Sequence, residues 1–298
     1  MARFARPMPG QVVLVTGAAR GIGAESARRL AAEGASVSLV GLEPEKLERT
    51  AASCGRDSAW FEADVTDAYA LERAVAGTVE RFGGIDTVIA NAGIAPAGTV
   101  RAIDPAAFER AVEVNLLGVW RTVRACLPHV IERRGYVLVV ASLAAAVHPP
   151  GMAPYAASKA GAEAFADCLR LEVRHMGVDV GVGYFSWIAT DMVAGSDAHP
   201  ALGFVRGRAH GPFRKTYPVS AVGDAVLRGI ELRRRWITVP NWLRPVLLLR
   251  GAAWLFDPSM RSSVAEMDER FERDVAERGR AEASAPVGAG GAALRDHL

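Results

Sequence analysis

Cysteine and lysine are both scarce in this chain of 298 residues. Three cysteines occur far apart, at Cys54, Cys126 and Cys168, and they fit neither a disulfide framework nor a zinc site. This usage suits a reducing cytoplasm, where we expect the protein to act. Arginine supplies all but three of the 35 basic residues, so each lysine that is retained is a candidate for a specific role.

An excess of charge of one sign is also missing, because 35 Lys and Arg stand against 33 Asp and Glu. This balance argues against a dedicated nucleic-acid binder. No apolar run approaches the roughly 18–20 residues of a membrane-spanning helix. The first ten residues are too short and too broken by proline for a signal sequence. A globular, soluble α/β or α protein remains.

Short apolar runs alternate with helical segments along the first 240 residues. Such alternation predicts parallel strands joined by right-handed crossovers, hence a doubly wound, Rossmann-like α/β fold with helices on both faces of the sheet. The expected strands are 11–16, 37–40, 59–61, 87–90, 136–141, 178–184 and 236–239, and the expected helices are 22–33, 45–52, 67–82, 105–131, 155–175 and 220–234.

The organisation predicts one domain over residues 1–280. Its core is 10–192, followed by a substrate-side insertion at 193–217 and a helical C-terminal extension at 218–280. The stretch 191–217 lacks clear periodicity and is expected to be mobile. An amphipathic helix is expected at 262–278, with Val264, Met267, Phe271 and Val275 on one face. The Ala/Gly-rich tail at 281–298 is expected to be disordered.

A glycine-rich turn joins the first expected strand to the first expected helix. Gly17, Gly21 and Gly23 let the backbone turn tightly and approach a pyrophosphate without Cβ clashes. The N-terminus of the following helix offers unpaired N–H groups and a partial positive charge. The sequence therefore predicts a dinucleotide site, although one or two glycines at such a turn are often only structural.

The spacing is T-G-x-x-x-G-x-G, and here the chain resembles the short-chain dehydrogenase/reductase family in its compact single-domain branch. The resemblance covers about residues 10–192. Further matches follow in order at the ends of the expected elements: Asp64-Val65, Asn91-Ala92-Gly93, Asn115, Ser142 and the pair Tyr155 and Lys159.

The resemblance implies a nicotinamide cofactor and a set of residues that bind it. Its cofactor-binding positions are Gly17, Ala19, Arg20, Gly21, Ile22, Gly23, Asp64, Val65, Asn91, Ala92, Gly93, Tyr155, Lys159, Ile188 and Thr190. It implies a catalytic set of Ser142, Tyr155, Lys159 and Asn115, and no metal. In the family, the asparagine holds a water behind the lysine and extends a proton path.

Tyr155 and Lys159 are four residues apart, so a helix projects both side chains from one face. A nearby ammonium and an oxidised nicotinamide would favour the phenolate, lowering a pKa of about 10 toward neutrality. Tyr155 would then exchange a proton with the substrate oxygen, and Ser142 would hydrogen-bond the same oxygen. Taken singly, a Tyr–Lys pair is more often an ordinary surface feature, and a serine after a strand is more often a cap.

The chain departs from the family at two places. Phe185-Ser186 stands where Pro-Gly is usual, which alters the expected floor of the substrate site. At the end of the second strand, Gly41 replaces the acid typical of NAD-preferring members, and Glu43 follows two residues later. Arg20 stands where NADP-preferring members often carry a basic residue, so the pattern favours NADP(H) over NAD(H).

The substrate side is expected to be apolar and roomy. We expect it to be lined by 143–154, Trp187, Met192 and the insertion with Phe204 and Phe213. Such a lining suits a small hydrophobic ketone or alcohol. The family resemblance implies a homodimer or homotetramer built through the helices near 105–131 and 155–175.

Residues 206–250 carry ten Lys and Arg beside several tryptophans, against only Asp224 and Glu231. Two interpretations are open: a peripheral membrane contact, or a covered core or subunit interface with arginines at its rim, which we favour. Two other functions compete with an NAD(P)(H)-dependent oxidoreductase that interconverts a secondary alcohol and a ketone. One is a catalytically idle cofactor-binding regulator on the same fold, and the other is a membrane-peripheral protein acting through its C-terminal stretch.

Overall fold

A seven-stranded parallel sheet forms the centre of the computed structural model, which describes residues 6–209, 211–252 and 257–291. The strand order is β3-β2-β1-β4-β5-β6-β7. The chain adds β2 and β3 on one side of β1 and then adds β4 to β7 on the other side, as in a doubly wound sheet. This confirms the predicted fold class. The strands are β1 (Val12–Thr16), β2 (Ser36–Gly41), β3 (Ser58–Glu62), β4 (Thr87–Ala90), β5 (Tyr136–Val140), β6 (Asp179–Phe185) and β7 (Trp236–Val239).

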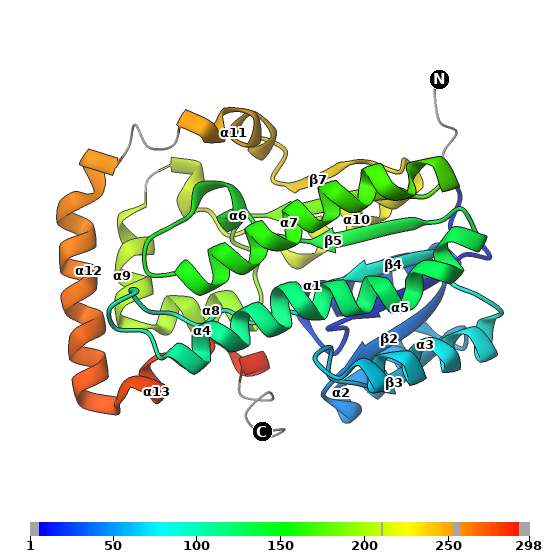
Figure 1. Cartoon of the computed structure of the whole chain (residues 1–298), viewed down its shortest axis with the longest axis horizontal. Coiled ribbons are helices and arrows are strands. Elements are labelled where there is room, and N and C mark those ends of the chain that lie inside the picture. Colours follow the sequence, from blue (N-terminus) through cyan, green and yellow to red (C-terminus); the bar gives the residue numbers. More distant parts are fainter. Residues whose placement is uncertain (1–5, 210, 253–256, 292–298) are drawn as a thin grey trace.

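Helices cover both faces of the sheet (Figure 1). Alternate residues of β1 point to opposite faces: Leu14 belongs to one buried apolar cluster, whereas Val13 and Val15 belong to another. The first cluster includes side chains of α3 (Ala68–Phe82), α5 (Gly118–Glu132) and α7 (Ala153–Val173). The second includes side chains of α1 (Gly21–Ala32), α2 (Pro44–Cys54) and α10 (Val219–Glu231).

The helix expected at 105–131 is present as a continuous helical stretch from Pro105 to Glu132, with a π-turn in its middle that the sequence did not predict. It consists of α4 (Pro105–Val112), a π-helical turn η1 (Glu113–Leu117) and α5. Asp104 caps α4 by accepting a hydrogen bond from the Ala106 amide at 2.8 Å. A π-turn adds one residue to the helical repeat and is common at functional sites.

The stretch 191–217 is helical rather than irregular, which corrects the expectation of a mobile insertion. It forms α8 (Asp191–Ala198), α9 (Pro200–Arg208) and the turn η3 (Gly211–Arg214). The Thr190 hydroxyl caps α8, and Nδ1 of His199 accepts the Ala201 amide at 3.2 Å to cap α9. Because neither helix is strongly amphipathic, hydrophobic periodicity does not reveal them.

The C-terminal part packs across the end of the molecule where the strands terminate (Figure 1). After α11 (Leu243–Leu249) come α12 (Asp257–Arg278) and α13 (Arg280–Ala283). Met267 and Phe271 of α12 are fully buried in a cluster with Ala97, Ala102, Ala201 and Leu202. The short elements α6 (Ala144–Val147) and η2 (Arg174–Met176) complete the chain.

Residues 281–291 are packed against the body of the protein, where the composition predicts a disordered tail. Ala283 and Ser284 are buried, and the Val287 amide donates to the Ala95 carbonyl at 3.0 Å. Within 281–291 the expectation of disorder was therefore wrong; 292–298 lies outside the described residues.

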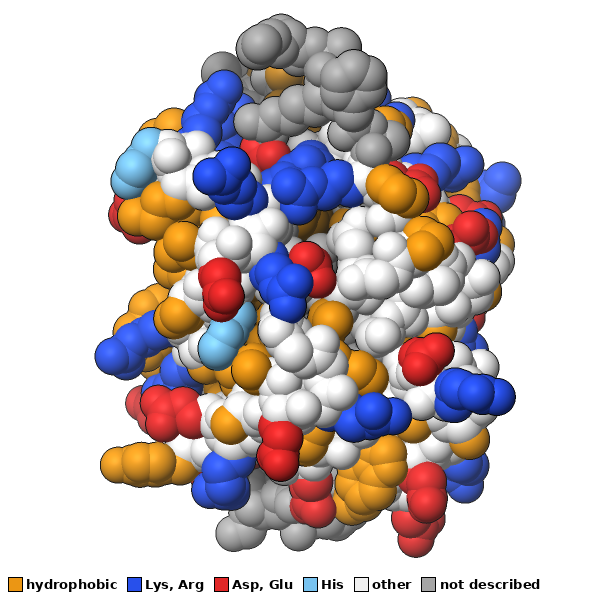
Figure 2. Space-filling view, turned by 90° about the vertical axis from the view of Figure 1, so that its right-hand side faces the viewer, with side chains coloured by type: hydrophobic (Ala, Val, Ile, Leu, Met, Phe, Trp, Pro, Cys, Tyr) orange, Lys and Arg blue, Asp and Glu red, His pale blue; other side chains and the backbone are white. Residues whose placement is uncertain are grey.

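None of the described helices combines the length and the apolarity needed to cross a bilayer. Figure 2 shows the end of the molecule opposite α12, and there basic side chains lie among acidic ones. On this face, positive and negative side chains are therefore intermixed, in line with the near-neutral net charge of the chain.

Candidate active site

The glycine-rich turn after β1 has the conformation that its sequence predicts. Gly17 and Gly21 have positive φ angles of 64° and 55°, which favour glycine. A Cβ on Gly23 would lie 2.3 Å from the carbonyl oxygen of Gly17, so the first turn of α1 can pack on the loop only without a side chain there. The turn thus presents backbone and the α1 N-terminus to the pocket.

Asn91 fixes this turn to the end of β4. Its side-chain amide donates to the carbonyl oxygens of Thr16 at 3.0 Å and Gly17 at 3.2 Å. The Asn91 backbone amide donates to the Thr16 hydroxyl at 3.1 Å. The amide at position 91 therefore supports the loop, as the family resemblance implies, and Ala92 and Gly93 line the pocket beside it.

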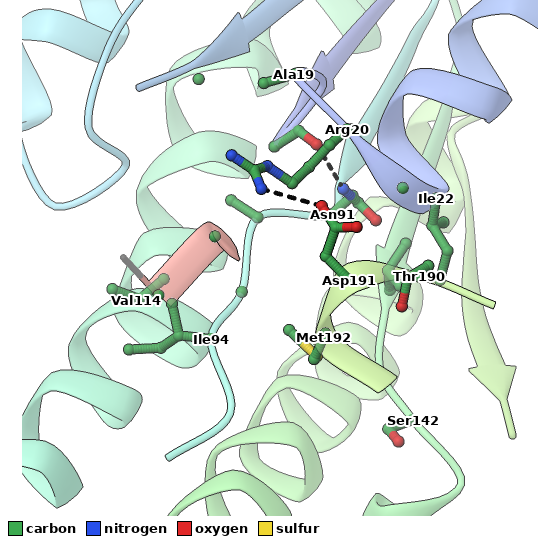
Figure 3. A pocket seen from close by; sticks show the side chains of 18 of the residues that line it. Ala19, Arg20, Ile22, Asn91, Ile94, Val114, Ser142, Thr190, Asp191 and Met192 are labelled. Carbon is green, nitrogen blue, oxygen red and sulfur yellow. Dashed lines mark hydrogen bonds and ion pairs between the residues drawn. The ribbon is translucent and has the colours of Figure 1, made fainter. Parts of the chain in front are cut away.

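Arg20 is held by two carboxylates at the pocket, those of Glu43 and Asp191, and Figure 3 shows the contact with Asp191. It donates to Glu43, with a 2.8 Å contact from Nε, and to Asp191 at 3.0 Å. Lys46 also donates to Glu43, at 2.7 Å. Burial alone would raise the pKa of the Glu43 carboxyl, but the hydrogen bonds from Arg20 and Lys46 outweigh it and lower that pKa. Glu43 is therefore an ionised pocket residue.

Asp64 lies across the pocket after β3 and is fixed by a neighbouring helix. Its carboxylate accepts hydrogen bonds from the Arg110 guanidinium at 2.9 Å and from the Thr66 amide at 2.8 Å. Arg110 belongs to α4, so this ion pair joins the end of β3 to the segment that carries Asn115. Val65 lines the pocket next to Asp64.

Ser142 and Tyr155 meet at the carboxyl end of β5. Ser142 follows that strand, and its hydroxyl accepts the Ala144 amide at 3.1 Å, so it also caps α6. Tyr155 is half-buried in the first turn of α7 and hydrogen-bonds Ser142. Burial raises the pKa of the Tyr155 phenol, and the Ser142 hydrogen bond only partly opposes that rise. The phenol is thus held in its protonated form.

Lys159 lies one helical turn after Tyr155 and is almost completely buried. Its ammonium donates to the Val140 carbonyl oxygen at 2.8 Å and lies 5.9 Å from the centre of the Tyr155 ring. Burial lowers the pKa of Lys159 to about 8. The sequence led us to expect a lowered phenol pKa when an oxidised nicotinamide adds its charge to that of Lys159. In the chain alone, burial raises the pKa of Tyr155 and lowers that of Lys159.

Asn115 is fully buried on the π-turn and uses its whole side chain to brace the site. Its oxygen accepts the Ile94 amide at 2.8 Å, and its nitrogen donates to the Ile94 carbonyl and to the Ser158 hydroxyl, both at 2.9 Å. It thereby joins the loop after β4 to α7. A Cβ on Gly93 would lie 3.1 Å from both the Asn115 oxygen and the Lys159 ammonium, so these groups pack closely.

The segment after β6 keeps its place despite Phe185-Ser186. The Phe185 carbonyl accepts the Leu143 amide at 3.1 Å, and the Ser186 amide donates to Val239 at 2.9 Å. A Cβ on Gly183 would come within 2.9 Å of the Phe185 ring, so glycine there makes room for the phenylalanine. Ile188 and Thr190 follow at the pocket wall.

A cavity of about 250 Å³ collects these residues. Every residue that the sequence assigned to the cofactor or the reaction lines it, except Gly23 and Asn115, which support the lining from behind. Figure 3 shows Ile94 and Val114 on one side and Asp191 and Met192 on the other.

The substrate side differs from the expected lining. Met192 is in the cavity wall, but Trp187, Phe204 and Phe213 are not among the lining residues. The Arg206 guanidinium lies over the Trp187 ring, and Phe213 packs edge-on against Trp242. The apolar residues of the wall that sequence reasoning missed include Ile94, Val114 and Val287, which only tertiary contacts bring there, whereas Val193 belongs to the insertion that was expected to line the site.

The basic stretch at 206–250 is less positive than its composition suggests. Five of its ten cations have carboxylate partners in the structure; the pairs are Arg206–Asp197, Arg208–Glu266, Arg233–Asp179, Arg235–Asp167 and Arg250–Glu163. Such pairing reduces the field that an anionic membrane would meet. On α11, Leu248 and Leu249 remain exposed.

Comparisons with known proteins agree with this geometry. The model of the family described as short chain dehydrogenase matches residues 11–201. The 2,3-dihydro-2,3-dihydroxybenzoate dehydrogenase of Bacillus subtilis is 32% identical over 248 residues, which cover 80% of this chain and 95% of that protein.

Two solved structures share the architecture. An alcohol dehydrogenase from the archaeon Thermococcus sibiricus, complexed with 5-hydroxy-NADP, superposes with a TM-score of 0.67 at 26% identity, over 76% of this chain and 95% of that one. A protein from Burkholderia phymatum, solved in complex with NAD, gives a TM-score of 0.73 at 22% identity, over 85% of this chain and 96% of that one.

Proposed function

The chain belongs to the short-chain dehydrogenase family, and on that premise we propose that it is an NAD(P)(H)-dependent oxidoreductase that interconverts a secondary alcohol and a ketone. The observation that carries the proposal is the meeting of Ser142, Tyr155 and Lys159 in one pocket with the glycine-rich turn. A regulator that only bound a cofactor would need Tyr155 and Lys159 for binding at most, and it would not need Ser142 beside them.

The residues present fit a bound dinucleotide. Gly17 and Gly21 let the turn bring its backbone close to a ligand, and the N-terminus of α1 supplies N–H groups and positive potential for a pyrophosphate. Gly93, Ile188 and Thr190 would hold the nicotinamide end, near Tyr155. When bound, the cofactor supplies or accepts the hydride.

Each catalytic side chain then has a distinct task. Ser142 and Tyr155 hydrogen-bond each other, so together they hold a substrate oxygen that enters between them. Tyr155 gives its phenolic proton to that oxygen during reduction and takes one back during oxidation. Lys159 supplies a buried positive charge one helical turn away, which favours proton loss from the phenol. Asn115 positions the loop after β4 and α7 relative to each other.

In carbonyl reduction the protonated phenol of Tyr155 acts as the acid. Oxidation requires the phenolate instead. The positive charge of an oxidised nicotinamide, added to that of Lys159, would favour it.

For the cofactor we propose NADP(H) over NAD(H). Arg20 and Lys46 both lie on the Glu43 carboxylate, so two cations stand at the edge of the pocket near the end of β2. A 2′-phosphate carries more charge than a carboxylate and would compete with Glu43 for these donors. Gly41 has no acidic side chain to place in the pocket. The Glu43 carboxylate limits the preference for NADP(H), because it competes with a 2′-phosphate for Arg20 and Lys46.

The substrate is proposed to be a small hydrophobic ketone or secondary alcohol, since the cavity that contains Ser142 is also lined by the apolar side chains of Ile94, Val114, Met192 and Val193. We also propose a homodimer or homotetramer through α5 and α7. Two observations support such a face: Trp120 is 39% exposed and Leu171 is 66% exposed in the single chain.

A screen of compact ketones with NADPH and NADH, and of the matching alcohols with NADP⁺ and NAD⁺, tests the proposal. We expect cofactor fluorescence to rise on binding and at least one carbonyl to be reduced. Binding of the cofactor without turnover of any carbonyl or alcohol would favour an idle regulator instead.

A further inference from the structure

The residues from Ser284 to Gly291, here called the C-terminal strap, join the two sides of the active-site pocket. On one side the Val287 amide donates to the Ala95 carbonyl, in the loop after β4, at 3.0 Å. On the other side the strap packs on α8, where a Cβ on Gly195 would lie 2.4 Å from the Gly288 nitrogen. Residues 287 and 288 therefore connect the loop after β4 with α8, the two sides of the pocket.

The strap is anchored at its beginning by polar contacts. The Ser284 hydroxyl is buried and accepts the Asp104 amide at 2.8 Å. Just before it, the Arg280 guanidinium donates to the Arg101 carbonyl at 2.8 Å. The preceding α12 is held by the buried side chains Met267 and Phe271. These contacts fix where the strap enters the pocket.

Glycine at position 288 is required by the course of the strap. Its φ is +82°, and a Cβ there would lie 2.5 Å from the Asp191 carbonyl oxygen. Val287, Gly290 and Gly291 line the same cavity as Ser142 and Tyr155. Because Gly290 and Gly291 have no side chains, Val287 is the apolar side chain that these three strap residues present to the site.

We propose that the strap is the substrate-side wall of the active site and that Val287 is a specificity-determining residue. It limits the size of the groups that flank the reacting carbon. A wall that connects the loop after β4 with α8 leaves room for a compact ketone, such as a single six-membered ring, and excludes a fused bicyclic or long-chain ketone. This inference rests on the proposed function.

Two variants at the wall test the size limit. Val287→Ala enlarges the site, and we expect kcat/KM for 2-decalone relative to that for cyclohexanone to rise about 10-fold, the discrimination that one or two methyl groups provide. Val287→Phe should lower the same ratio. The dissociation constant for NADPH, measured by fluorescence, should stay within about two-fold of the wild-type value in both variants. An unchanged ratio in both would overturn the proposal.

A third variant displaces the strap without altering its sequence. Gly195→Ala puts a methyl group against the Gly288 backbone, whereas Gly207→Ala, in the neighbouring α9, meets open space and serves as the matched control. Only in Gly195→Ala do we expect the hydrogen-exchange rate of residues 284–291 to rise. Only there should kcat/KM for 2-decalone increase relative to that for cyclohexanone. Exchange equal to that of wild type would show that the strap does not depend on this contact and would contradict the proposal.

A complex that cannot turn over separates this inference from the proposed function. NADP⁺ with cyclohexanone forms no product, so protection of 284–291 from hydrogen exchange reports occupancy of the wall alone. We expect the ketone to add protection beyond that given by NADP⁺. Protection by cyclohexanone without turnover of any carbonyl or alcohol in the screen would contradict the proposed function but support the strap, whereas turnover of cyclohexanone without protection would overturn the strap proposal.

Discussion

The ammonium nitrogen of Lys159 lies 2.8 Å from the carbonyl oxygen of Val140, the last residue of β5. This contact keeps a charged group inside the protein, and it places that group behind Tyr155 rather than on the phenol itself. The site therefore combines a lysine whose pKa is lowered to about 8 with a tyrosine whose pKa is raised, both through burial. The predictions below follow from this arrangement and from its surroundings.

Lys159→Met should change how stability depends on pH. The folded pKa of about 8 lies below the ordinary value of 10.5, so between these values the unfolded chain binds more protons at this site. The free energy of unfolding of the wild type minus that of the variant should therefore increase by about 1–3 kcal/mol as pH rises from 8 to 10.5. Urea unfolding at several pH values measures the difference.

Lys215→Met removes one positive charge from an exposed lysine and serves as the control for this experiment. A difference between wild type and Lys159→Met that stays flat from pH 7 to pH 10.5 would show that the lysine is not destabilised by burial.

Substitutions at the Arg20–Glu43 pair should shift cofactor preference in opposite directions. Glu43→Gln frees Arg20 and Lys46 for a 2′-phosphate, and we expect NADPH to bind about 10-fold more tightly, because charge-assisted hydrogen bonds to phosphate are the stronger type. Arg20→Gln should weaken NADPH binding by a similar factor and leave NADH almost unaffected. Fluorescence titration with both cofactors gives the ratio. Equal losses for NADPH and NADH in Arg20→Gln would exclude a role in discrimination, with exposed Arg28→Gln on the same helix as the control.

Asn115→Leu should destabilise the protein through the groups that it leaves unpaired. The buried amide makes three hydrogen bonds, to both backbone groups of Ile94 and to Ser158. Their loss should lower the free energy of unfolding by about 2–4 kcal/mol. Chemical unfolding measures this change, and Glu109→Gln, at an exposed position of α4, should stay within about 0.5 kcal/mol of wild type. A similar small effect for Asn115→Leu would contradict the bracing role.

Much of the fold could be predicted from the sequence because local patterns and global structure agree. β-branched runs such as 12–16 are buried strands, and Gly17, Gly21 and Gly23 occur where a side chain would clash with the backbone or require an unfavourable positive φ. The shared pocket of Ser142, Tyr155 and Lys159 could be predicted because the carboxyl ends of parallel strands share one edge of the sheet.

What the sequence did not reveal depends on contacts between distant segments. The strap has the composition of a disordered tail, yet the backbones of Gly195 and Ala95 hold it in place. The π-turn that carries Asn115 leaves no periodic signal of its own. The helices α8 and α9 had visible caps, Thr190 and His199, but too little amphipathicity to be predicted from hydrophobic periodicity.

The most direct test of the account is Tyr155→Phe, which removes the phenolic hydroxyl that supplies the proton and keeps the ring. With a ketone that the wild type reduces, we expect kcat to fall by about 100-fold or more, while the NADPH dissociation constant, read by fluorescence, changes by less than about two-fold. A reduction rate equal to that of wild type would show that Tyr155 is not the general acid.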